Sequence, residues 1–118
     1  RRRRLADTYK ELLTHSDITL PEVQSGAEPV WHLFVVRVSD RERLQTQLKE
    51  AGIATGVHYP IPLHLQPAYE GIQLRAPLPV TEKTAQTVVS LPMYPELKPE
   101  QMESICNAVA GAFDMASR

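Results

Sequence analysis

Several features that would assign a function directly are scarce in this sequence. Its single cysteine, Cys106, cannot form an internal disulfide, and no apolar run approaches the roughly 20 residues that a membrane helix needs. Thirteen basic against fourteen acidic residues give a formal net charge of −1, which offers no global attraction to nucleic acid or anionic lipid. We therefore expect a reducing cytoplasm as the compartment, with neither nucleic acid nor membrane as partner.

Glycine is also scarce. The five glycines are too scattered for a dinucleotide fingerprint or a Walker loop. No Gly-x-Ser-x-Gly elbow is present, and Cys106 has no cationic neighbour in the sequence, so nucleophilic catalysis has no support. On its own residues this chain does not form a complete enzyme.

The first segment predicts a helix over residues 2–15. Leu5, Tyr9, Leu12 and Leu13 recur on one helical face. The four arginines that open the chain could form a nucleic-acid patch, but nothing later adds basic surface, so a solvated helix is favoured. The start also lacks an initiator methionine, and we expect an internal cut of a longer protein.

The middle of the chain alternates strand and helix signals. Residues 21–29 read as a loop, and residues 30–38 predict a strand covered on both faces. Ser39, three residues before Glu42, has capping-box spacing for a helix that ends at Gly52. Residues 53–59 predict a second strand, followed by a proline-rich loop to Pro79.

The last third predicts two more helices and a short strand. Thr81 can cap a helix with Ala85, Val88 and Val89 facing inward, and residues 90–94 follow as a strand. Pro99 suits the first position of a final helix, whose apolar residues recur at helical spacing: Met102, Ile105, Cys106, Val109 and Phe113. The chain as a whole is therefore predicted to be one α+β domain, with a small, mainly antiparallel sheet of about three strands packed against helices.

The proline-rich loop carries the candidate chemistry. His58 could donate a hydrogen bond to a ligand phosphate, carboxylate or hydroxyl, or transfer a proton, because histidine titrates near neutral pH; a structural histidine is an equal alternative. Tyr59 is expected to pack with its hydroxyl at an edge. His64 lies six residues further on, which matches no metal-ligand spacing, so no metal site is expected. His15 and His32 read as structural.

Three stretches carry a resemblance to a known family: Gly52-Ile-Ala-Thr-Gly-Val-His-Tyr-Pro60, His64-Leu-Gln-Pro-Ala-Tyr69, and Pro79 to Glu82 with Leu91-Pro-Met-Tyr-Pro95. They resemble the C-terminal small domain of the DegT/StrS sugar aminotransferases. That family binds pyridoxal phosphate (PLP) through a lysine of its large domain and moves an amino group, usually from glutamate, onto a nucleotide-linked keto sugar. None of the four lysines here stands in that context.

The resemblance implies that residues 1–118 form one small domain, that residues 1–15 are the tail of an interdomain helix, and that the large domain is absent. It implies a homodimeric parent. His58 and Tyr59 are expected to approach the sugar and cofactor, with His64 as a weaker substrate-binding candidate. The stretch from Gly71 to Pro77 departs from the family pattern at Arg75, which leaves the sugar open.

Two readings from other classes remain beside this one. A free-standing α+β ligand-binding or regulatory module would show the same alternation of elements and the same lack of a catalytic set. A structural interaction domain would pair through an exposed apolar face. The sequence upstream of Arg1 would separate the three.

Overall fold

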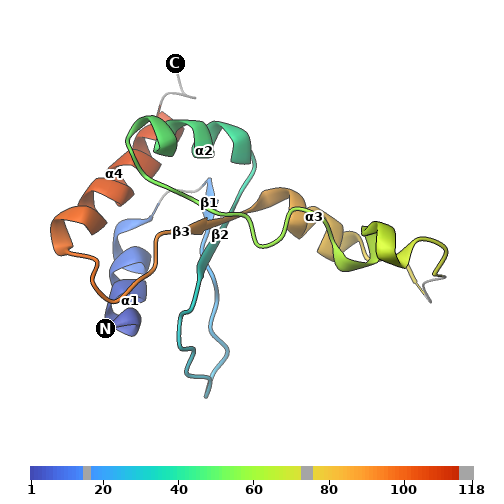
Figure 1. Ribbon diagram of the computed structural model, residues 1–118. Helices are drawn as coiled ribbons and strands as arrows, with labels where there is room; N and C mark the ends of the chain where they lie inside the picture. Colours follow the sequence, from blue (N-terminus) through green and yellow to red (C-terminus); the bar gives the residue numbers. More distant parts are fainter. Residues whose placement is uncertain (15–16, 73–75, 115–118) are drawn as a thin grey trace.

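The computed structural model describes residues 1–14, 17–72 and 76–114. It confirms the α+β prediction with a three-stranded antiparallel sheet in the order β1-β2-β3 (Figure 1). The elements follow one another as α1 (Arg2–Leu12), β1 (Ile18–Thr19), β2 (Phe34–Val38), α2 (Arg41–Glu50), α3 (Pro79–Thr87), β3 (Val88–Leu91) and α4 (Pro99–Asp114). The predicted His15 end of the first helix lies outside the described residues.

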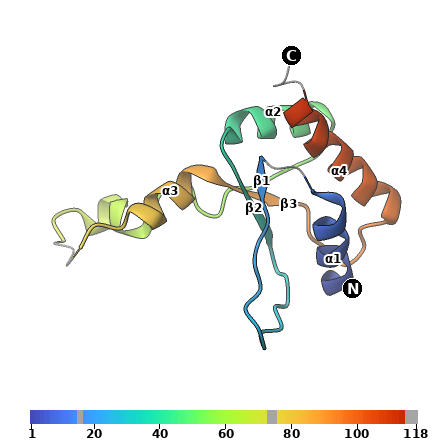
Figure 2. The same cartoon turned by 180° about the vertical axis from the view of Figure 1, so that it is seen from behind.

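Three helices cover the sheet. α4 packs against both α1 and α2, and the three gather on the side away from α3 (Figures 1 and 2). The centre of the resulting core is fully buried and comes from helices and sheet alike: Tyr9, Phe34, Val36, Leu44, Leu48, Val89, Met102 and Val109. We call this part of the molecule the body.

α1 is more firmly tied down than a solvated helix would be. Tyr9 is fully buried, stacks on Phe34 with ring centroids 4.7 Å apart, and donates its hydroxyl hydrogen to the carbonyl of Pro92 at 2.7 Å. The guanidinium of Arg2 donates to the carbonyls of Trp31 (3.1 Å), His32 (3.1 Å) and Met93 (3.4 Å), a role the sequence did not predict. Leu12, predicted to face inward, is 46% exposed.

β2 is shorter than predicted and is covered on one face only. It begins at Phe34 rather than Val30, because β3 offers four partners, which pair with Phe34 to Arg37. Trp31, with φ of 50°, also lies outside the extended region. Burial alternates along the strand, and Arg37 is exposed. The sequence also missed β1, which lies just before the predicted loop and pairs with Arg37 and Val38 at the end of β2.

The ends of α2 and α3 differ from their predicted caps. Asp40, not Ser39, caps α2, since its carboxylate accepts from the backbone N–H of Arg43. The predicted stop holds, because Gly52 adopts φ of 74°, which glycine tolerates at a helix C-terminus. Pro79, not Thr81, opens α3, since proline fixes a helical φ where no N–H is needed.

The last two predicted strands also change. Residues 53–59 form no strand; Gly56 alone pairs with Ser90, and the prolines that follow cannot extend a ladder. β3 covers Val88 to Leu91 rather than 90–94, because Pro92 ends it, so Val88 and Val89 belong to the sheet and not to α3. All four residues of β3 are buried.

α4 confirms the prediction from Pro99 onward. Met102, Ile105, Cys106 and Val109 face the core, and Phe113 packs partly against it. Across the described ranges, we find no helix with the length and apolar content to span a bilayer.

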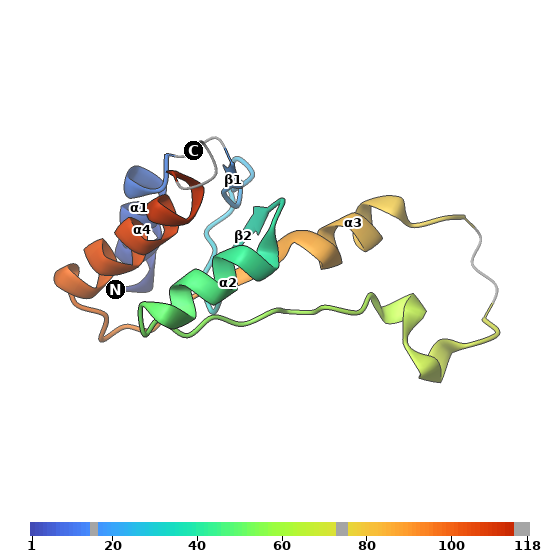
Figure 3. The same ribbon diagram turned by 90° about the horizontal axis from the view of Figure 1, so that it is seen from above.

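A long segment leaves the body and returns to it. Residues 58–87, here called the arm, run outward past two short 3₁₀ turns, η1 (Leu63–Leu65) and η2 (Pro67–Tyr69), and come back as α3 (Figure 3). The molecule accordingly measures 49 × 40 × 23 Å along its principal axes. We refer to residues 58–72 as the outgoing limb and to residues 76–87 as the returning limb.

Candidate functional site

The arm is fastened to the sheet where it leaves the body. Gly56 donates its backbone N–H to the carbonyl of Ser90 (3.1 Å) and accepts the N–H of Ser90 (2.8 Å). Two residues later, Nδ1 of His58 lies 2.8 Å from Oγ of Ser90. Ser90 is buried, whereas His58 is exposed, so a core hydroxyl orients a surface imidazole.

Glycine is needed at position 56 for this contact. A Cβ atom built there would lie 2.7 Å from Cε1 of His58, which is closer than real Cβ atoms approach other atoms. Any side chain at position 56 would therefore push the imidazole away from Ser90. The close approach of ring and backbone explains why position 56 is a glycine.

The contact with Ser90 leaves Nε2 of His58 as the ring nitrogen for a ligand. If the serine hydroxyl donates to Nδ1, Nε2 carries the hydrogen and can donate to a ligand oxygen. If Nδ1 carries the hydrogen and donates to Oγ, Nε2 is an acceptor and can take a proton. In both tautomers the ring is held at one nitrogen and available at the other.

Tyr59 adds an aromatic surface beside the imidazole. The two rings meet edge to face, with centroids 5.4 Å apart and planes at 79°. Tyr59 is 72% exposed, so the prediction that it packs is wrong; its contact with His58 leaves most of the phenol in solvent. A largely exposed tyrosine with a fixed neighbour suits stacking or hydrogen bonding with a ligand.

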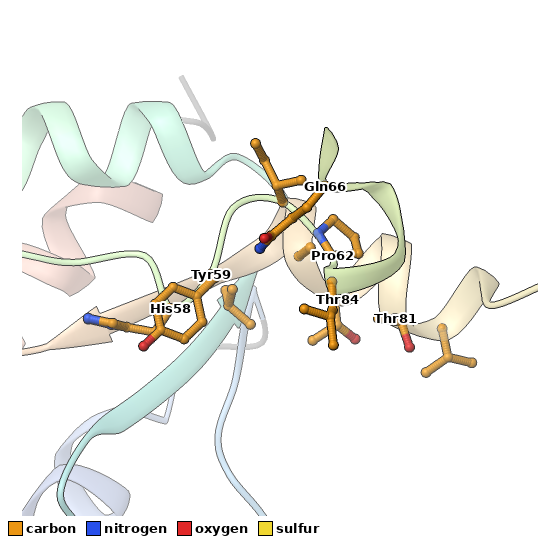
Figure 4. Close-up of a pocket in the computed structure, with 11 residues that line it drawn as sticks. His58, Tyr59, Pro62, Gln66, Thr81 and Thr84 are labelled. Atoms are coloured by element: carbon orange, nitrogen blue, oxygen red, sulfur yellow. The ribbon is translucent and has the colours of Figure 1, made fainter. Parts of the chain in front are cut away.

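A groove of about 540 Å³ runs from His58 and Tyr59 between the limbs of the arm. Gln66 reaches it from the outgoing limb, and Thr81 and Thr84 reach it from α3 (Figure 4). The remaining walls are apolar: Ile61, Pro62, Leu63, Val80, Ala85 and Val88. An apolar trough with a few amide and hydroxyl groups is typical of small-molecule sites.

His64 does not line this groove. It lies in a separate hollow of about 300 Å³ with Tyr69, Ile72 and Leu78, and its Nε2 is 3.0 Å from Oε1 of Glu82. The structure thus brings His58 and Tyr59 together and places His64 elsewhere.

The lining of the groove does not supply the groups that would bind PLP or a metal. The groove lining contains no lysine or arginine; Lys10 lies over the Trp31 ring at 5.0 Å, and the other three lysines lie on α2, on α3 and just before α4. The groove residues therefore do not fit PLP, which needs a lysine and a phosphate cradle. No cluster of ligating side chains suited to a metal occurs in the described part of the chain.

Cys106 is buried in α4, and this burial raises the pKa of its thiol to about 11. It remains a neutral thiol near neutral pH, without the character of a nucleophile.

Sequence reasoning missed the polar groups that surround His58 and Tyr59. Ser90 had a usable signal, since a single hydroxyl inside an apolar strand needs a partner. Gln66, Thr81 and Thr84 had none, because their meeting depends on how the arm folds back.

The body and the arm together define a small α+β domain with a groove built on a projecting segment. Residues 1–110 match the DegT/DnrJ/EryC1/StrS aminotransferase family, and the chain belongs to this family. The chain is 44% identical, over 109 residues, to dTDP-3-amino-3,6-dideoxy-alpha-D-galactopyranose transaminase from Aneurinibacillus thermoaerophilus, a match of 92% of this chain and 30% of the relative. It is 40% identical, over 108 residues, to UDP-2-acetamido-2-deoxy-3-oxo-D-glucuronate aminotransferase from Pseudomonas aeruginosa, again 92% of this chain and 30% of the relative.

The fold agrees with that assignment. The crystal structure of S. venezuelae DesV in complex with a ketimine intermediate superposes with a TM-score of 0.88 at 40% identity, covering 95% of this chain and 31% of DesV. The chain thus spans about 30% of the length of the relatives that it matches.

Proposed function

We propose that this chain is the C-terminal small domain of a PLP-dependent aminotransferase that acts on a nucleotide-linked keto sugar. The match to a named sugar transaminase covers 92% of this chain but only 30% of the transaminase, and the groove lacks a lysine. This combination carries the proposal. A lysine and a phosphate cradle for PLP must then come from the remainder of the protein, the large domain. In this proposal, residues 1–15 are the tail of the helix between the two domains.

The arm is the part of this domain that would face the large domain. Eight of the twelve exposed large hydrophobic side chains among the described residues lie on it: Tyr59, Ile61, Leu63, Leu65, Tyr69, Ile72, Leu78 and Val80. A concentration of exposed hydrophobic side chains on one segment is typical of a surface that another domain covers. Covering it would close the mouth of the groove and exclude water from a bound sugar.

Within the closed site, Nε2 of His58 would contact the sugar or cofactor, and Tyr59 would line the same wall. Ser90 would hold the imidazole in one orientation, which is the contribution that a positioned donor makes to catalysis. Glutamate is the expected amino donor, the parent is expected to be a homodimer, and the absence of paired cysteines fits a cytoplasmic location.

Expression of the full-length protein tests the proposal. With PLP and glutamate it should convert a nucleoside diphosphate keto sugar into the amino sugar, detected by mass spectrometry. The 118-residue chain alone should not carry out this conversion. It should also form no borohydride-reducible link between PLP and Lys10, Lys49, Lys83 or Lys98. A full-length protein without transfer, together with a 118-residue chain that folds and binds a ligand alone, would favour the free-standing module.

A further inference from the structure

Among the described residues, one side-chain hydrogen bond joins the two limbs of the arm. Nε2 of His64, in η1, lies 3.0 Å from Oε1 of Glu82, in the first turn of α3. The guanidinium of Arg41 ties the returning limb to the body by donating to the carbonyl of Ala85, and the remaining hydrogen bonds between described residues of the arm stay within one limb. The His64 side chain is 10% exposed, the Glu82 side chain 44%.

The chemistry of this contact is defined by the carboxylate. An ionised glutamate only accepts hydrogen bonds, so Nε2 of His64 must carry the hydrogen and donate it. Nδ1 then holds no hydrogen unless the ring is protonated, in which case the pair becomes a charge-assisted bond. In both states Nε2 is occupied by Glu82, which leaves it unavailable to a substrate.

The positions of the two residues place the bond between the groove walls. Leu63 and Gln66, on either side of His64 in sequence, line the groove from the outgoing limb. Thr81 and Thr84, on either side of Glu82, line it from the returning limb. The bond therefore connects the backbone segments that present both walls, without itself lining the groove.

We infer that His64 and Glu82 are positioning residues that brace the arm and set the spacing of the groove walls, and that His64 does not contact the substrate. This inference rests on the proposed function for its catalytic consequence. Loss of either partner would let the two limbs separate, so the polar groups that meet a bound nucleotide sugar would no longer converge.

The test uses the full-length protein with His64→Ala, Glu82→Ala, His64→Gln and the double variant His64→Ala/Glu82→Ala. The two single alanine variants should each raise KM for the nucleotide sugar roughly threefold to tenfold, the span of one modest hydrogen bond, with a smaller change in kcat. The double variant should match the single ones, because the second change removes a bond already lost. His64→Gln, whose amide can still donate to Glu82, should retain most of the affinity.

Hydrogen exchange supplies a readout that does not depend on activity. Amides of residues 61–69 and 79–84 should exchange faster in both alanine variants than in the wild type. In His64→Gln they should exchange at rates close to those of the wild type. Lys83→Ala, an exposed change on the same helix turn, is the matched control and should alter neither readout.

Two results would overturn the brace. If Glu82→Ala behaves as wild type while His64→Ala and His64→Gln lose affinity equally, His64 contacts the substrate directly. If arm exchange is unchanged in both alanine variants, the bond does not hold the limbs. A wild-type protein without aminotransferase activity would refute the proposed function alone, since the exchange comparison would still decide whether the brace exists.

Discussion

The body and the arm use similar residues for opposite purposes. In the body, Leu44 and Leu48 of α2 are almost entirely buried against the rest of the core. In the arm, Leu63 and Leu65 are 61% and 56% exposed. The same side chain stabilises the fold in one region and remains uncovered in the other. Exposed hydrophobic residues that concentrate on one segment are typical of a surface that another partner covers, and we propose this role for the arm.

The first prediction compares the effect of one substitution, leucine to alanine, on the free energy of unfolding in the body and in the arm; it has the largest expected effect. In the 118-residue chain, Leu48→Ala should lower the free energy of unfolding by about 2 to 5 kcal/mol, because it opens a cavity in the core. Leu65→Ala should change it by less than about 0.5 kcal/mol, because this side chain is 56% exposed. Urea denaturation measures both. Equal losses would mean that the arm packs as tightly as the body.

The second prediction concerns catalysis in the full-length protein. His58→Ala should reduce kcat/KM roughly tenfold to a hundredfold, the effect of losing one hydrogen bond to a charged group, about 1.5 to 3 kcal/mol. The melting temperature should change little, because His58 is exposed. His32→Ala, an exposed histidine outside the arm, is the control. A lower melting temperature with unchanged turnover per folded molecule would make His58 structural.

The third prediction tests a hydrogen bond of the body against a hydroxyl of the arm. Tyr9→Phe removes the donor to the Pro92 carbonyl at 2.7 Å and should lower the free energy of unfolding by about 1 to 2 kcal/mol. Tyr69→Phe, at a 39% exposed residue, should leave it unchanged. Thermal or urea unfolding of both variants decides. An unaffected Tyr9→Phe variant would show that water replaces the hydroxyl.

The smallest expected effect is a pH dependence of stability that comes from two buried groups of the body. Burial raises the pKa of Cys106 from 9.0 to about 11 and also raises the pKa of Tyr9. Since the folded chain holds these protons more tightly than the unfolded chain, the stabilisation is complete below about pH 9 and is lost as pH rises through about 11. Denaturation at several alkaline pH values measures the slope, which Cys106→Ala should reduce. If the slope is the same in that variant, the Cys106 thiol is not a source of the pH dependence.

The contrast between body and arm also decides how much could be predicted from the sequence. α2 and α4 were predictable because their apolar residues recur at helical spacing and pack against the core of this same chain. β1 was missed, since two residues are too short for a period to appear. The strand over residues 53–59 was wrong because Gly56 alone finds a partner.

The residue types of the candidate site could be proposed from the sequence, but their arrangement could not. The sequence singled out His58 and Tyr59 because prolines and aromatic residues concentrate around them. The contact with Ser90, and the separation of His64 into its own hollow with Glu82, depend on how the arm returns to the body. Local sequence carries no signal for contacts across 18 or 32 residues.

We propose that the arm is uncovered in this chain and covered by the large domain in the full-length protein. Hydrogen exchange, compared peptide by peptide between the 118-residue chain and the full-length protein, tests this most directly. Amides of residues 59–72 should exchange rapidly in the short chain and slowly in the full-length protein, while those of α4 should be protected equally in both. Equal exchange of the arm in the two proteins would show that the large domain does not cover it.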